Sequence, residues 1–106
     1  YANEIKMQEL GVKKETLDKH GAVSKETAKQ MAIGAKKKFK TDFAIATTGI
    51  AGPSGGTLEK PVGMVWIAIA TPTKIITEKF QFNDNRERNI RRTALSALNM
   101  FRKELL

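Results

Sequence analysis

The sequence contains no cysteine and only one histidine, His20. The absence of cysteine excludes a disulfide, a thiolate nucleophile and a sulfur-ligated metal within these 106 residues. A single histidine also excludes a histidine-rich metal site, and any Ser-His-Asp triad would have to use His20. We therefore expect no metal site.

Long apolar runs are also absent. The longest, from Met64 to Ala70, is too short to cross a bilayer, so we expect no membrane partner. The apolar fraction of 41% and the charged fraction of 28% are typical of a soluble globular protein. The length suits one domain over residues 1–106, and the visible start carries no targeting segment, so we expect a cytoplasmic location.

Acidic residues are fewer than basic ones, which gives a formal net charge of +8. Clustered cations can bind nucleic acid, but aromatic residues make up only 7% of the chain and none alternate with the lysines as a base-stacking surface requires. The cluster Lys36-Lys37-Lys38 ends a predicted helix, where cations offset the helix dipole. The composition therefore disfavours nucleic acid as the main partner.

Helical periodicity recurs in four segments. We predict short helices over residues 3–10 and 13–19, and a longer one over 25–39 with Ser24 as its N-cap. The last helix follows Asn83-Asp84-Asn85 and runs to about Glu104. Apolar residues spaced for one face of this helix are Ile90, Ala94, Ala97, Leu98, Phe101 and Leu105. In the helix 25–39, the corresponding face is Ala28, Met31, Ala32, Ala35 and Phe39.

Three strands are predicted, over residues 42–46, 62–70 and 75–82. No helix fits between the first two strands, so they should be antiparallel, and Thr71-Pro72-Thr73-Lys74 should turn the chain into a hairpin. The first and third strands then run the same way. Their ends bring the residues after position 47 and the segment 83–92 to one edge of the sheet.

A glycine-rich loop, Thr47 to Gly56, lies at that edge and holds four of the eight glycines. It is no phosphate-binding P-loop, because Pro53 removes an amide donor and a strand follows in place of a helix. Two interpretations remain: a flexible connection between strands, or a site built from Thr48 and the neighbouring backbone amides.

Arginines crowd the start of the last helix, where the helix dipole disfavours cations. Arg86 precedes Ile90 by one helical repeat and should share its sheet-facing side. Guanidinium groups bind phosphate or carboxylate in bidentate fashion, which favours an anionic substrate, although a solvated or Glu87-paired cluster explains the arginines equally well, above all Arg88 and Arg92.

Lys6 lies on the first short helix and has two interpretations. It is either a solvated surface residue or, if it faces the same edge, a partly buried amine suited to proton transfer. His20 and Asp18 are interpreted as structural or solvated.

Several blocks, taken together and in order, resemble a known family. They are Tyr1-Ala2-Asn3-Glu4-Ile5-Lys6, Leu10-Gly11-Val12, His20-Gly21-Ala22-Val23-Ser24, Thr48-Gly49-Ile50-Ala51-Gly52-Pro53-Ser54-Gly55-Gly56, Glu59-Lys60-Pro61-Val62-Gly63 and Asn85-Arg86-Glu87. Over its whole length the chain resembles the C-terminal domain of the competence/damage-inducible protein CinA, which also occurs alone as nicotinamide-nucleotide amidase.

The resemblance implies an α/β fold, a three-layer α/β/α sandwich with a mixed sheet. It also implies hydrolysis of nicotinamide mononucleotide, a small-molecule nucleotide, to nicotinate mononucleotide and ammonia without metal or cofactor.

The resemblance also implies roles for individual residues. Lys6, Tyr1 and Thr48 would be catalytic, with Lys6 assisting proton transfer. The residues that would contact substrate are Gly49, Ile50, Ala51, Gly52 and an arginine that holds the phosphate, Arg86 or Arg91.

One departure from the family is large. Its domain starts about fifty residues earlier with a strand and a Glu-Ser-Cys-Thr-Gly-Gly motif that carries the proposed nucleophilic serine, and nothing here matches that motif. We therefore expect a domain that lacks its first strand and helix and is inactive alone. The alternatives are a non-catalytic nucleotide-binding or regulatory module and a competence-linked nucleic-acid accessory domain. A homo-oligomer is compatible with all three.

Overall fold

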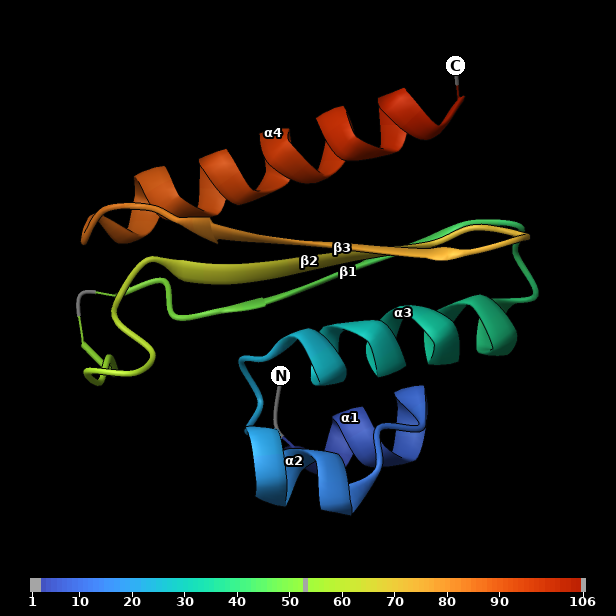
Figure 1. The fold of residues 1–106 in the computed structure, drawn as a ribbon, viewed down its shortest axis with the longest axis horizontal. Coiled ribbons are helices and arrows are strands. Elements are labelled where there is room, and N and C mark those ends of the chain that lie inside the picture. Colours follow the sequence, from blue (N-terminus) through green and yellow to red (C-terminus); the bar gives the residue numbers. More distant parts are fainter. Residues whose placement is uncertain (1–2, 53, 106) are drawn as a thin grey trace.

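The structure, a computed structural model, describes residues 3–52 and 54–105, with side chains from residue 6 onward. The elements along the chain are α1 (Asn3–Leu10), α2 (Lys14–His20), α3 (Lys25–Phe39), β1 (Ala44–Gly49), β2 (Met64–Ala70), β3 (Ile75–Gln81) and α4 (Arg86–Leu105). Figure 1 shows three layers, with α1 to α3 on one face of the sheet and α4 on the other. The α/β fold class and its sandwich layers are as predicted.

The sheet has the order β1-β2-β3, and both pairs are antiparallel. Thr48 lies opposite Trp66 and Gly49 opposite Val65 in the first pair. The predicted hairpin and the shared direction of β1 and β3 are confirmed. The parallel pairing that a mixed sheet requires does not occur among these three strands.

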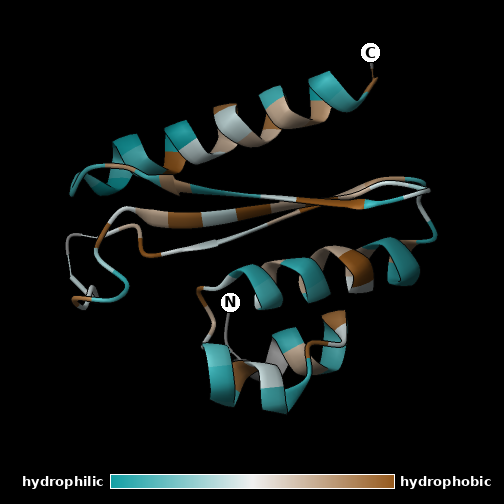
Figure 2. Cartoon of the chain, viewed as in Figure 1, coloured by the Kyte–Doolittle hydropathy of each residue, from teal (hydrophilic) through white to brown (hydrophobic). Residues whose placement is uncertain are grey.

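The central strand β2 divides two hydrophobic cores, and Figure 2 shows its long apolar stretch. Branched side chains at Val65, Ile67 and Ile69 pack toward α4, with Ala97 and Met100. The intervening Ala68 and Ala70 pack toward α3, because successive strand residues point to opposite faces. Covering both faces explains why this strand reads as nearly continuous apolar sequence.

Helix α3 begins where its cap predicts. Ser24 has extended backbone and its hydroxyl accepts a hydrogen bond from the Thr27 N–H at 3.2 Å. Ala28, Met31 and Ala32 are buried as expected. The prediction that Phe39 is buried is wrong, since 65% of it is exposed. The helix ends there and Lys40 takes a left-handed conformation that turns the chain toward β1, so Phe39 lies past the last turn that meets the sheet.

Gly34 of α3 allows α1 to pack closely against this helix. A Cβ at position 34 would collide with the carbonyl oxygen of Leu10, the last residue of α1. The backbones of α1 and α3 therefore approach too closely there for any side chain.

The predicted buried face of α4 is confirmed at Ala97 and Phe101 and wrong at its other four positions. Its buried residues are Asn89, Ala97 and Met100, whereas Ile90 is 51% exposed and Leu98 60% exposed. Ala94 and Leu105 are exposed as well. Asn89, one residue before Ile90, is buried in its place, and its side-chain contacts are described below.

Candidate functional site

The glycine loop is anchored to the sheet at its start. The Ile50 N–H donates to the Met64 carbonyl at 3.0 Å, and the Gly63 N–H donates to the Ile50 carbonyl at 2.7 Å. The pairing of β1 with β2 thus continues one residue beyond β1. The loop consequently leaves the sheet from a fixed point, which excludes a connection that is flexible from its first residue.

Gly52 brings the loop against the segment that follows β3. It has φ +94°, which favours glycine, and a Cβ there would lie 2.5 Å from Val62 Cγ1 and 3.2 Å from the Asp84 carbonyl oxygen. The glycine therefore allows a close approach to Val62 and to the backbone of Asp84.

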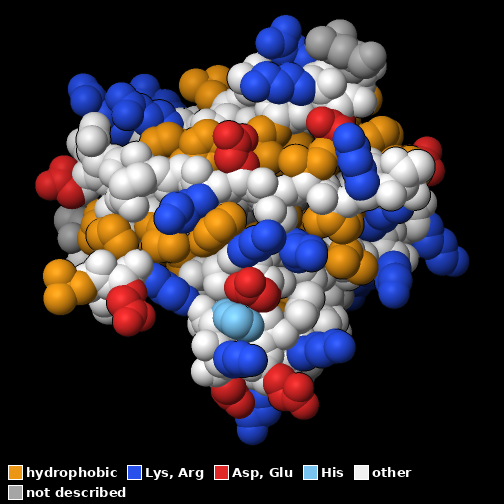
Figure 3. Space-filling model, viewed as in Figure 1, with side chains coloured by type: hydrophobic (Ala, Val, Ile, Leu, Met, Phe, Trp, Pro, Cys, Tyr) orange, Lys and Arg blue, Asp and Glu red, His pale blue; other side chains and the backbone are white. Residues whose placement is uncertain are grey.

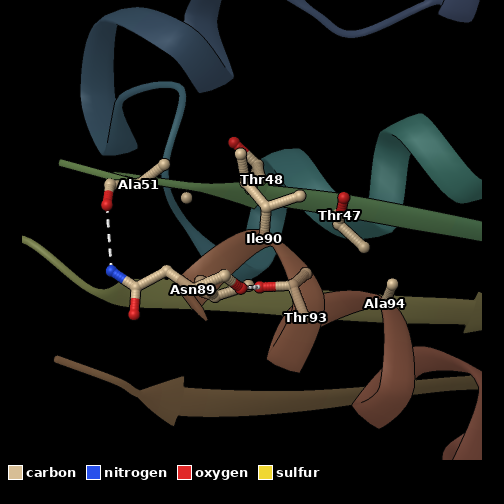
Figure 4. A pocket seen from close by; sticks show the side chains of 9 residues that line it. Thr47, Thr48, Ala51, Asn89, Ile90, Thr93 and Ala94 are labelled. Carbon is tan, nitrogen blue, oxygen red and sulfur yellow. Dashed lines mark hydrogen bonds between the residues drawn. The ribbon is translucent and has the colours of Figure 1, made fainter. Parts of the chain in front are cut away.

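Asn89 joins this loop to α4. It is 1% exposed, and its Nδ2 donates to the carbonyls of Ala51 at 2.9 Å and Asn83 at 2.7 Å. Figure 4 shows the amide reaching toward Ala51. The Thr93 hydroxyl donates in turn to the Asn89 carbonyl at 2.7 Å. One buried side chain thus connects α4 to the segment just before it and to the glycine loop, 38 residues earlier in the sequence.

A cavity of about 430 Å³ lies where the end of β1, the loop and α4 meet (Figure 4). Its lining residues are Thr47, Thr48, Gly49, Ala51, Val65, Asn89, Ile90, Thr93 and Ala94. The lining is mostly apolar with a few hydroxyl and backbone groups, which is typical of a small-molecule site. The topology argument placed the loop and the start of α4 at one edge, and the structure confirms that they meet.

Thr48 contacts both the segment before α3 and the cavity. It is buried, lines the cavity, and its hydroxyl donates to the Ala22 carbonyl at 2.7 Å. The hydroxyl proton is therefore used in this hydrogen bond, but the hydroxyl oxygen can still accept a hydrogen bond through its lone pairs.

Arg86 is exposed and reaches back to the loop, with Nη1 3.5 Å from the Gly52 carbonyl oxygen. Its predicted companion Ile90 is half exposed and lines the cavity, whereas Arg86 is not among the lining residues. Arg91 is exposed and is not among the lining residues. No ion pair between described residues joins Glu87 to an arginine, so the arginine cluster is not paired within α4.

Lys6 occupies a different layer. It is only 5% exposed, its carbonyl accepts from the Val12 N–H at 3.0 Å, and α1 packs on α3. The structure does not place Lys6 in the lining of the β1–α4 cavity. Its burial is at odds with the solvated interpretation. Tyr1 lies outside the described residues.

Two residues were not predicted. Asn89 interrupts an apolar spacing three residues after Arg86, and a polar residue on a buried face is the signal that marks it. Lys60, quoted above only within a block that carries the family resemblance, donates from Nζ to the His20 carbonyl at the end of α2, where a cation offsets the helix dipole.

The basic side chains do not form one continuous patch on the face that Figure 3 draws. Acidic and apolar side chains lie between the Lys and Arg side chains there. Within the described part of the chain, no three metal-ligating side chains gather and no helix is long and apolar enough to span a membrane.

Comparison with known proteins identifies the family. Residues 1–105 match the CinA C-terminal domain. The chain belongs to the CinA C-terminal domain family. It is 51% identical over 105 residues to a CinA-like protein of Cytophaga hutchinsonii, covering 99% of this chain and 25% of that protein.

Solved CinA structures share the fold. The competence/damage inducible protein CihA from Agrobacterium tumefaciens superposes with a TM-score of 0.93 at 43% identity, covering 95% of this chain and 62% of that one. The competence damage-inducible protein A from Klebsiella pneumoniae gives 0.94 at 32% identity, covering 99% and 65%. The chain spans about a quarter of the length of the curated relatives it matches. These names refer to competence and damage induction and specify no reaction.

Proposed function

We propose that this CinA C-terminal domain forms the substrate-binding part of an amidohydrolase that converts nicotinamide mononucleotide to nicotinate mononucleotide and ammonia. One observation supports the proposal most directly. The glycine loop and the start of α4 share one cavity, and Arg86 rests against that loop. A neutral, mostly apolar cavity, with a cation on the loop that continues from its lining, suits a planar amide joined to a phosphate.

The residues divide into groups by what each can offer the substrate. Thr48 and the segment Gly49 to Gly52 supply an acceptor oxygen and backbone donors near the end of β1. Arg86, or Arg91 one and a half turns further, would hold the phosphate through paired N–H donors. Lys6 and Tyr1 would transfer protons, and the family's serine would attack the amide carbon.

The chemistry requires a nucleophile that this segment does not supply. Attack of the serine oxygen on the carboxamide carbon gives a tetrahedral oxyanion, and its collapse expels ammonia once the amine has gained a proton. Water then hydrolyses the resulting acyl-serine ester, which releases nicotinate mononucleotide and restores the serine hydroxyl. We therefore expect turnover from the full-length protein and none from residues 1–106 alone.

Ammonia and nicotinate mononucleotide formation by the full-length protein test the assignment. A folded full-length protein that releases neither from nicotinamide mononucleotide would contradict it. Turnover by residues 1–106 without any upstream segment would contradict the placement of the nucleophile.

A second candidate, a non-catalytic nucleotide-binding module, is favoured by the position of Lys6. A binding module needs only the loop and an arginine, which meet here, whereas Lys6 is not part of the cavity lining. Tight binding of nicotinamide mononucleotide by a full-length protein that fails to hydrolyse it would support this alternative.

A further inference from the structure

Helix α4 leaves the outer strand of the sheet open. Ile45 and Thr47 of β1 lie directly opposite Ile69 and Ile67 of β2, so they share the face of the sheet on which α4 packs. Ile67 and Ile69 are fully buried there. Ile45 is 37% exposed and Thr47 is exposed, although both stand on that same face. The covering layer therefore protects β2 and leaves these β1 side chains accessible.

The backbone of β1 is open at the edge of the sheet. The Ile50 N–H donates to the Met64 carbonyl, and in an antiparallel pair every second residue turns its backbone groups to the partner strand. Ile45, Thr47 and Gly49 therefore point their N–H and C=O groups away from β2. Strand β1 comes first in the order β1-β2-β3, so no strand among the described residues pairs with them. Unpaired groups of this kind are a template for another strand.

The two edges of the sheet differ in charge. The β3 edge carries Glu78 and Lys79, both exposed, and charged side chains on an edge strand oppose pairing with another strand. No residue of β1, Ala44–Gly49, is charged. Of the two edges, β1 is the one whose sequence permits a further strand.

Apolar side chains of α4 extend this open surface. Ile90, Ala94 and Leu98 follow one another at four-residue spacing, so they form one stripe along the helix. Ile90 is 51% exposed and Leu98 60%. Ile90 and Ala94 line the cavity together with Thr47, which places the stripe beside β1 (Figure 4). An exposed apolar stripe that continues into an open strand edge is typical of an interface.

The solved CinA chains contain more polypeptide than these residues. This chain covers 62% of one and 65% of another, so more than a third of each lies outside the match. The match takes in 95% and 99% of this chain, so the further polypeptide is additional to the elements described above. A segment of the same polypeptide is held near this surface at a high effective concentration, which favours it over a second molecule.

We propose that the β1 edge and the α4 stripe bind a segment of the full-length protein outside residues 1–106. One strand of that segment pairs with the outer backbone groups of β1, and apolar side chains next to that strand cover the stripe. Because Thr47 and Ile90 also line the cavity, the docked segment forms a further wall of the candidate site. The inference concerns the assembly of the domain and does not depend on the amidase chemistry.

Ala94→Lys in the full-length protein tests the docking. Ala94 is exposed among the described residues, so a lysine there costs little unless another segment covers the position. With the segment docked, the substitution places a charge in an apolar contact and should lower the midpoint of urea unfolding by about 1 M. Leu95→Lys is the control, because Leu95 is 67% exposed and points about 100° away around the helix. Equal midpoints for the two variants would overturn the proposal.

Hydrogen exchange in the unaltered full-length protein tests the strand pairing. The amides of Ile45, Thr47 and Gly49 should exchange about a hundredfold or more slower than the amide of Gly55, which lies in the exposed part of the glycine loop. Exchange as fast as that of Gly55 would rule out pairing at this edge.

Dilution separates the proposed segment from a second copy of the chain. An intramolecular strand protects the Thr47 amide at every protein concentration. Protection that disappears on dilution, while sedimentation shows a dimer dissociating, would identify a second copy and overturn the proposal. A full-length protein with a protected β1 edge and no ammonia release would retain this inference and exclude the amidase assignment.

Discussion

The hydroxyl of Thr48 lies 2.7 Å from the carbonyl oxygen of Ala22, so the end of β1 is tied to the entry of α3. Because Thr48 also lines the cavity, one side chain connects the layer below the sheet to the candidate site. Its hydroxyl therefore ties the strand end that borders the candidate site to the entry of α3.

Thr48→Val keeps the shape of the side chain and removes the hydroxyl. It should lower the free energy of unfolding by about 1 kcal/mol, because the buried Ala22 carbonyl loses its partner. Thr48→Ser retains the donor and should lose less. Urea unfolding followed by the fluorescence of Trp66, the single tryptophan of these residues, measures both. Equal losses for the two variants would exclude a contribution from the hydroxyl.

Ser24→Ala removes the N-cap of α3. We expect a loss of about 1 kcal/mol, since the Thr27 N–H would lose its acceptor at the start of the helix. Ser24→Asp supplies another acceptor and should preserve most of the stability. If the two variants unfold at the same urea concentration, the capping bond contributes nothing measurable.

Gly34→Ala tests the close approach of α1 to α3. In an exposed helix this change stabilises by about 1 kcal/mol, but here the added Cβ collides with the Leu10 carbonyl. We expect destabilisation by about 1–3 kcal/mol. Lys37→Ala, at an exposed position of the same helix, is the control and should change little. A more stable Gly34→Ala protein would show that α1 does not pack there.

Arg86→Gln tests the phosphate contact. Under the proposed amidase activity it should raise KM of the full-length protein for nicotinamide mononucleotide about tenfold, because the proposed charged hydrogen bond to phosphate would be lost. Arg92→Gln, the matched exposed arginine of α4, should leave KM unchanged. Nicotinamide riboside lacks the phosphate, so its turnover should be insensitive to both variants. An effect of Arg91→Gln in place of Arg86→Gln would transfer the role to Arg91.

Elements with a local signal could be predicted from the sequence. Ser24 and the spacing of alanines and methionine placed α3 at residues 25–39, where the structure has it. The turn after Ala70 placed the hairpin. The first strand was predicted too early, because β1 continues through the two threonines to Gly49 and its side chains alternate between buried and exposed.

Features that depend on contacts with residues elsewhere in the chain could not be predicted from the sequence. Apolar spacing predicts that α4 buries Ile90 and Leu98, yet Asn89 is buried, and its amide nitrogen donates to carbonyls 6 and 38 residues away. The same limit applies to the site. Chain direction brought the loop and Arg86 together, but no pattern in the sequence specifies the face of the sheet on which Lys6 is buried.

The alternation of side chains along β2 also makes the two halves of the molecule energetically separable. The core beneath the sheet and the core under α4 share no buried residue. Substitutions in different cores that lie well apart should therefore have additive effects on stability. Stabilising changes in the α1–α3 layer can then offset destabilising ones around Asn89, so that the loop's geometry can be varied while the protein stays folded.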